Sequence, residues 1–280
     1  MFCSHALAER IDRAEMRWSA AVAETIARRT PEARSSVSPI AGGLAVFGIA
    51  GSPINKAIGI GFGAAIDEPV LEQIEHDWDD RGEAVRFELS TLADPSVAPV
   101  LTARGYRLTG FENVLGRIVS LDERDAALDG GMRITELPQD DWKEWLAVAL
   151  DGFAAPDGSA PGEETFSREA LEAVFGDVAA TPGMHRYLLD VAGVAAGAAS
   201  LRLDDGLAQL AGAATLPAFR RRGIQAALLG RRIADAARAG CDLAVVTVQP
   251  GSKSHANATR QGFSLLYSRA ILIRPLPTRP

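Results

Sequence analysis

Hydrophobic residues occur along the chain both at helical spacing and in short apolar runs, and together these patterns predict a mixed α/β protein. Residues 6–29 contain neither glycine nor proline and are rich in Ala, Glu and Arg, which predicts a long helix that ends before Pro31. Apolar positions at helical spacing from Val70 to Trp78 predict a second helix at 69–80. Short apolar runs between Gly, Ser, Pro and Asn predict strands. The other elements expected in the first half are strands at 42–49, 57–62, 84–89 and 106–119, a short helix at 97–104 and a loop at 35–39.

The segment from residue 120 to residue 131 is polar, with Asp-Glu-Arg-Asp followed by Asp-Gly-Gly. Few apolar anchors and several turn-forming residues are typical of a linker between domains. We therefore predict domains at 1–120 and 132–280, joined by a linker at 121–131. In the second domain the pattern predicts strands at 132–137, 185–191, 197–203, 207–216, 242–248 and 263–273, and helices at 140–150, 167–175, 224–238 and 254–261.

The stretch from Thr215 to Leu229 carries the clearest chemical signal. A strand of apolar and small residues ends at a proline, and a basic turn that contains Gly223 then leads into a helix. Because glycine has no Cβ, backbone N–H groups can turn inward around an anion at the positive end of the helix dipole. The guanidinium groups of Arg220, Arg221 and Arg222 match the geometry of phosphate oxygens. The turn is therefore predicted to hold a diphosphate.

A solvated run of basic residues is the alternative interpretation of this turn. Positive side chains in the first turn of a helix oppose the helix dipole, and they lower stability unless an anion neutralises them. The sequence breaks a local rule at this point, which favours an anion-binding turn over a surface charge run.

The same residues resemble a known family. The order Arg220-x-x-Gly223-x-Gln225-Ala226 is similar to the acyl-CoA signature of the GNAT superfamily of N-acetyltransferases, Gln/Arg-x-x-Gly-x-Gly/Ala. Gln225 replaces the commonest second Gly or Ala and narrows the space beside the phosphate, and Arg221 stands where many members have Gly. The cofactor-binding residues that the resemblance implies are Ala213, Ala214, Thr215, Arg220, Arg221, Arg222, Gly223, Ile224, Gln225, Ala226 and Asn257.

The predicted order of elements extends this resemblance over about 140 residues of the second domain, which ends in the Gly262-Phe263 turn common in the family. The first half repeats the order loosely, with Asp67 and Glu68 where an anion would lie. We expect two GNAT-like domains, each with a mostly antiparallel, twisted mixed sheet flanked by helices. Like charges repel a diphosphate, so the first domain is expected to bind no cofactor.

Acyl transfer to an amine requires a polarised thioester carbonyl, a neutral amine and protonation of the leaving thiolate. In the family, exposed backbone groups of a bulged strand hold the acyl group; here these would be Ala213 to Thr215, whose small side chains fit a tightly packed strand equally well. Many members have a Tyr on the last helix that acts as the general acid, but the matching position here holds Ala258. Tyr267 and Ser254 are the nearest catalytic candidates by sequence, with alternative roles as a strand residue and a helix cap.

The sequence offers no direct general base on the predicted strand at 207–216, whose only polar side chain before Thr215 is Gln209. Deprotonation through water, or binding of an amine that is already neutral, is therefore expected. His255 lies near the proposed site and is expected at the surface. The loop acids that can bind a cationic amine, or can simply be solvated, are Asp157, Glu163 and Glu164.

Composition narrows the class of protein further. The chain has 280 residues, 47% hydrophobic and 23% charged, with a net charge of -7, which disfavours non-specific nucleic-acid binding. Its two cysteines, Cys3 and Cys241, are far apart and lack neighbours at metal-ligand spacing, so neither a disulfide framework nor a metal is expected. No stretch approaches the ~20 apolar residues of a membrane span, and the charged N-terminal segment lacks a signal-peptide core. A cytoplasmic protein without a membrane partner is expected.

These observations predict an acetyltransferase that moves an acetyl group from acetyl-CoA to an amine by direct attack in a ternary complex. No cysteine lies near the basic turn to carry the acyl group. The expected partner is a small-molecule or peptide amine, and a homodimer is compatible with the sequence. Two alternatives stay open: a CoA-binding sensor or adaptor that has lost catalysis, which the missing Tyr motivates, and a structural module without a ligand.

Overall fold

The computed structural model describes residues 1–125, 127–154 and 168–276 and divides into two compact units. Unit 1 comprises Met1–Val114 and the segment from Leu266 onward, and unit 2 comprises Leu115–Leu265. This corrects the contiguous domains predicted from the sequence, because strand β11 (Ser264–Arg274) pairs antiparallel with β4 (Val85–Ser90) of the first unit. None of the helices in the described residues combines the length and the apolar character needed to cross a bilayer.

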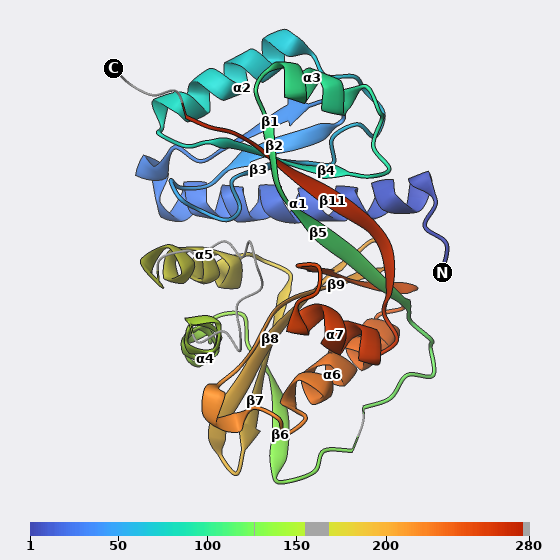
Figure 1. Cartoon of the computed structure of the whole chain (residues 1–280). Helices are drawn as coiled ribbons and strands as arrows, with labels where there is room; N and C mark the ends of the chain where they lie inside the picture. The colour runs from blue at the N-terminus through green and yellow to red at the C-terminus, as the bar shows by residue number, and fades with distance from the viewer. Residues whose placement is uncertain (126, 155–167, 277–280) are drawn as a thin grey trace. The chain divides into compact units, whose positions relative to one another are not determined.

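Unit 1 is a sheet with the strand order β1-β2-β3-β4-β11-β5, in which β3 and β4 are parallel. Helix α1 lies along one face, and α2 and α3 cover the other (Figure 1). Trp78, Phe87 and Tyr106 form part of the apolar core under α2 and α3. The remaining elements are α1 (His5–Arg29), η1 (Pro31–Ala33), β1 (Ser36–Ile40), β2 (Gly43–Phe47), β3 (Lys56–Ile58), α2 (Glu68–Asp80), α3 (Val97–Ala103) and β5 (Arg107–Ile118).

The loop predicted at 35–39 is wrong, since Ser36–Ile40 forms a strand that pairs with β2. Ala41 and Gly42 connect the two strands, and both have positive φ angles, which suits a tight hairpin. Pro39 is tolerated because β1 is the edge strand of the sheet. Its serines hid the alternating pattern that would have predicted a strand.

The face of the unit 1 sheet under α1 is unusually polar. Arg269 on β11 is 0% exposed and bonds Asp12 (2.5 Å) and Glu15 (2.7 Å) of α1. Lys56 on β3 bonds Glu15 (2.7 Å) and Glu88 (2.9 Å). Burial raises the pKa of Glu15, but the charges of Arg269 and Lys56 outweigh burial and lower this pKa to about 2. Paired charges therefore attach α1 to the sheet.

Glu112 on β5 lies at the edge of this network and should make unit 1 less stable as the pH rises. Burial, and then the charge of Glu88, raise the pKa of Glu112 from 4.5 to about 7. The folded state thus holds this proton more tightly than the unfolded chain, so the stabilisation is complete below about pH 4.5 and is lost as the pH rises through about 7. Glu112→Gln should therefore flatten the fall in stability between pH 5 and pH 8, as measured by urea unfolding.

Glu24→Gln, which alters an exposed carboxylate of α1, is the control and should leave the wild-type pH profile unchanged. Burial also raises the pKa of Asp12, with the same sign of effect, but Asp12 is present in all three proteins and cancels in the comparison. Identical profiles for wild type and Glu112→Gln would contradict the assignment.

Unit 2 is a sheet with the strand order β5-β10-β9-β8-β7-β6, in which β9 and β10 are parallel. Helices α4 and α5 lie on one face and α6 and α7 on the other (Figure 1). Trp145 is central to the core under α4, and Leu228 to the core under α6. The elements are β6 (Met132–Leu137), α4 (Lys143–Ala154), α5 (Arg168–Ala180), β7 (Met184–Val191), β8 (Val194–Asp204), β9 (Leu207–Thr215), η2 (Pro217–Phe219), α6 (Ile224–Arg238), β10 (Leu243–Val248) and α7 (Lys253–Arg260).

The two halves of the chain repeat one order of elements. Both contain a hairpin, a third strand, a loop and a helix, then a strand parallel to the third, a short helix and a last strand. In unit 1 this series is β1-β2-β3-α2-β4-α3-β5, and in the second half of the chain it is β7-β8-β9-α6-β10-α7-β11. Ligands of open α/β sheets bind at the carboxyl ends of parallel strands, which directs attention to the loops after β3 and β9.

Candidate functional site

Strands β9 and β10 separate part of the way along their length. Their parallel pairing covers Leu207–Gln209 and Leu243–Val245, while β9 continues to Thr215 and β10 to Val248. Beyond Gln209, one edge of β9 therefore has no strand beside it in the part of the chain that the structure describes. Such an edge presents backbone N–H and C=O groups that an extended ligand can use.

A bulge lies in the same part of β9. Ala198 of β8 is opposite Ala214, but Ser200 is opposite Ala211, so β9 contains one extra residue. Gly212 has a φ of 57°, and a Cβ there would lie 3.1 Å from Ser200 Oγ. The sequence prediction named Ala213, Ala214 and Thr215 but omitted Gly212. A glycine inside a run of strand residues is the signal that could have identified the bulge.

The loop that follows β9 leads directly into α6. Arg221 and Gly223 both have left-handed backbone conformations, with φ of 63° and 81°. Such residues let successive N–H groups of a turn converge on one point. Gly223 is the N-cap of α6 and is exposed. We call residues 220–226 the cradle.

The first turn of α6 lacks the side-chain cap that α1, α2 and α7 have. Ser4, Asp67 and Ser252 accept hydrogen bonds from the first turns of α1, α2 and α7, but Gly223 has no side chain to do so. Among the described residues, the N–H groups of Ile224, Gln225 and Ala226 have no partner. Together with the helix dipole, these N–H groups could hold an anion.

The three arginines of the cradle differ in their surroundings. Arg221 and Arg222 are exposed, and the Arg222 guanidinium lies 5.4 Å from the Phe219 ring centre. Arg220 instead donates long hydrogen bonds to the carbonyl oxygens of Thr215 (3.4 Å) and Gly152 (3.5 Å), which attaches the cradle to β9 and α4. Arg221 and Arg222 are thus the side chains available to an anion.

Gln225, the departure from the usual signature, has a specific contact. Its Nε2 donates to Thr215 Oγ1 at 2.8 Å. The side chain is therefore held against the end of β9, and the N–H groups of the cradle stay open. This geometry explains how a larger residue fits at this position.

The comparisons with known proteins agree with this geometry. Residues 137–263 match the model of the acetyltransferase (GNAT) family. This part of the chain belongs to the GNAT family. A search of curated protein sequences finds no significant match.

Solved structures share the fold over most of the chain. A GCN5-related N-acetyltransferase from Kribbella flavida is 19% identical with a TM-score of 0.68, covering 96% of each chain. A tandem GNAT protein from the clavulanic acid biosynthesis pathway is 11% identical with a TM-score of 0.60, covering 85% of this chain and 80% of its own. A GCN5-related N-acetyltransferase from Sphaerobacter thermophilus is 15% identical with a TM-score of 0.55, covering 74% and 68%. At these identities the likeness shows the mixed α/β fold.

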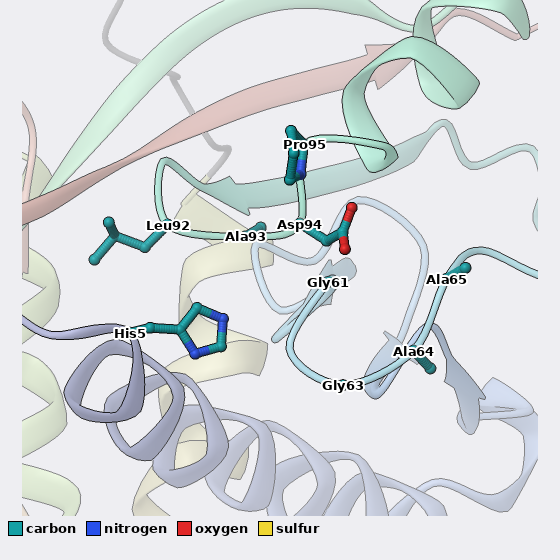
Figure 2. A pocket seen from close by; sticks show the side chains of 9 residues that line it. All are labelled: His5, Gly61, Gly63, Ala64, Ala65, Leu92, Ala93, Asp94 and Pro95. Carbon is teal, nitrogen blue, oxygen red and sulfur yellow. The ribbon is translucent and has the colours of Figure 1, made fainter.

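The position in unit 1 that corresponds to the cradle of the GNAT domain has the opposite charge. A hollow of about 520 Å³ lies beside the loops that follow β3 and β4, and His5 and Asp94 extend into it over Gly61 and Gly63 (Figure 2). The N-terminus of α2 is capped by the carboxylate of Asp67, which accepts from Val70 N at 3.5 Å. Among the described residues, no Lys or Arg lines this hollow. The expectation that unit 1 binds no diphosphate stays a prediction.

The two catalytic candidates from the sequence lie in different units. Tyr267 is in unit 1, 4% exposed, and its hydroxyl donates to Asp12 at 2.5 Å. Burial raises the pKa of Tyr267 well above its ordinary value, and its contacts make it part of the ion-pair network under α1. Ser254 is exposed on α7 of the GNAT domain, and the cap of that helix is Ser252 instead.

The other residues named from the sequence lie on α7 or outside the described residues. Asn257 accepts a hydrogen bond from Arg260 on the same helix, and Ala258 is buried at 5% exposure. His255 is half-buried and accepts from Gly251 N at 3.3 Å. The loop acids Asp157, Glu163 and Glu164 lie outside the described residues. Among the described residues, no group of His, Cys, Asp or Glu is arranged to hold a metal.

Proposed function

We propose that the GNAT domain transfers an acetyl group from acetyl-CoA to an amine of a small molecule or peptide. The uncapped first turn of α6 carries this proposal, because three free N–H groups and two exposed arginines suit a diphosphate. The separated edge of β9 lies between Gln209 and Thr215, before the cradle in the chain, and suits the extended pantetheine arm. Family membership supplies the reaction class.

The transfer needs no covalent intermediate on the protein. The amine nitrogen attacks the thioester carbonyl carbon, a C–N bond forms and the C–S bond breaks. The nitrogen loses one proton, and the sulfur of CoA gains one, so amide and free CoA thiol are the products. Cys241 is 3% exposed and lies at the start of β10, so it is not placed to carry the acyl group.

Binding and turnover test this proposal in sequence. We expect acetyl-CoA to bind the full chain with a Kd in the micromolar range, or about -8 kcal/mol, in a calorimetric titration. A panel of polyamines, amino acids and peptides is then screened for release of the CoA thiol. Initial rates at varied concentrations of both substrates should give intersecting lines, as expected for a ternary complex, and Cys241→Ala should keep the rate.

The absence of a Tyr at Ala258 favours a second candidate, a CoA-binding sensor without catalysis. Micromolar binding without turnover across the panel would support the sensor. An absence of binding at millimolar acetyl-CoA would overturn both candidates. Parallel lines in the rate plots would contradict direct attack.

A further inference from the structure

Arg232 of α6 is a buried cation without an acidic partner. Its side chain is 3% exposed, and within the described residues it makes no ion pair. Its donors go to carbonyl oxygens instead: Nε to Leu228 (3.1 Å), and Nη1 to Ser200 (3.0 Å) and Ala211 (3.4 Å). Burial lowers the pKa of Arg232 to about 10, which leaves the side chain charged at neutral pH. An unpaired buried charge is costly, so its retention calls for a physical reason.

Two of the carbonyl groups that Arg232 contacts lie at the bulge, Ser200 on β8 and Ala211 on β9. The extra residue disrupts the β8–β9 ladder between the pairs Ala198–Ala214 and Ser200–Ala211, and side chains add hydrogen bonds to backbone carbonyls there. Ser200 Oγ donates to the Ala211 oxygen at 3.0 Å, and Trp145 Nε1 donates to the Ala199 oxygen at 3.0 Å. Arg232 thus completes a set of three donors that keeps the bulge in shape.

The same contacts determine where the Gly212 N–H points. The peptide that joins Ala211 to Gly212 is trans, as are all the described peptide bonds, so its N–H is directed opposite to its C=O. Since this C=O faces β8 and Arg232, the Gly212 N–H faces the edge of β9 that β10 has left. That edge is where the proposed thioester would lie.

A hydrogen bond accepted by the C=O of a peptide group makes the N–H of the same group a stronger donor. Hydrogen bonds from Arg232 and Ser200 draw electron density toward the Ala211 oxygen and make the Gly212 N–H a better donor. A preorganised N–H of this kind stabilises the negative charge that develops on an acyl oxygen.

We propose that Arg232 is a positioning residue of the transfer reaction, which fixes the Ala211–Gly212 peptide and polarises the Gly212 N–H toward the acyl carbonyl. This inference rests on the proposed function. Arg232 contacts no substrate atom itself and acts through the peptide group of the bulge.

The test compares Arg232→Met, Arg232→Lys and Ser200→Ala with Arg231→Met as the matched control. Arg231 is the neighbouring residue, and it pairs with Asp235 at 2.9 Å instead of contacting the bulge. Acetyl-CoA labelled with carbon-13 at the carbonyl is bound to each full-length protein, and isotope-edited infrared spectroscopy measures the thioester C=O stretch. Binding to wild type should lower this frequency relative to free acetyl-CoA. Arg232→Met should return it toward the free value and lower kcat about tenfold to a hundredfold, with little change in Kd.

Arg232→Lys and Ser200→Ala keep the inference testable if Arg232→Met fails to fold. Arg232→Lys retains the charge and should keep part of the shift, and Ser200→Ala removes the other donor to the same carbonyl and should lose part of it. Arg231→Met should behave as wild type. If wild type binds and shifts the stretch but neither Arg232→Met nor Ser200→Ala changes it, this inference fails and the proposed function stands. If wild type does not bind acetyl-CoA, both fail.

Discussion

Replacing Gly223 by glutamate is expected to weaken acetyl-CoA binding by about a hundredfold or more. The new carboxylate would lie at the N-cap of α6, next to the free N–H groups of Ile224 and Gln225. It would act as the cap that this helix lacks, and it would repel the diphosphate that we place there. A hundredfold loss corresponds to about 2.7 kcal/mol, within reach of a like charge in direct contact. Calorimetric titration of wild type and variant measures the effect.

Gly230→Glu is the matched control, because it adds the same charge to the same helix away from its N-terminus. A Cβ at Gly230 meets no atom within 4 Å, so the substitution fits. Gly223→Ala separates charge from backbone strain, since the φ of 81° disfavours any side chain by about 1 kcal/mol. Binding by Gly223→Glu equal to that of Gly230→Glu would show that the anion lies elsewhere.

Arg269→Met is expected to destabilise unit 1 by about 3–5 kcal/mol. The variant keeps the apolar stem of the side chain but leaves the buried Asp12 without its cation and Glu15 with Lys56 alone. Removing one partner of a buried ion pair is costly because the remaining charge has lost both its water and its counter-ion. Hydrogen exchange followed by mass spectrometry should show faster exchange in peptides from β4 and α1, with peptides from α6 unaffected.

Two further variants show whether the burial of the pair causes this loss. Arg13→Met on α1 removes an exposed pair with Glu9, in which the arginine side chain is 57% exposed, and should cost about 0.5 kcal/mol or less. Asp12→Asn added to Arg269→Met should recover part of the stability, because it removes the charge left unpaired. Equal losses in Arg13→Met and Arg269→Met would contradict the role assigned to the network.

Most elements of the fold could be predicted from local patterns. The helical spacing from Val70 to Trp78 corresponds to α2, and the glycine-free run at 6–29 corresponds to α1. The edge strand β1 could not be predicted in this way, since its serines and proline match a loop and only its pairing with β2 makes it a strand. Strand β11 was predicted as a strand, but its place beside β4 was not, because strand pairing between distant segments leaves no local signal.

The candidate site shows the same division. A basic turn with one glycine before a helix was enough to predict the cradle, because dipole, backbone N–H groups and arginines are all local in sequence. Gly212 and Arg232 were missed, since the bulge depends on the register of β8 against β9, and Arg232 reaches it from the third turn of α6. Tyr267 shows the converse. It was a catalytic candidate because it is close in sequence to the last helix, and in the structure its hydroxyl bonds Asp12 under α1.

The sequence by itself determined the class of the protein and the repeated order of elements, and it predicted an anion-binding turn, because each depends on residues that are neighbours along the chain. Only the tertiary structure decided which strands lie side by side, where β9 bulges and separates from β10, and which charges are buried. Those features arise from contacts between segments far apart in sequence, such as Asp12 with Arg269, whose free energies no local pattern encodes.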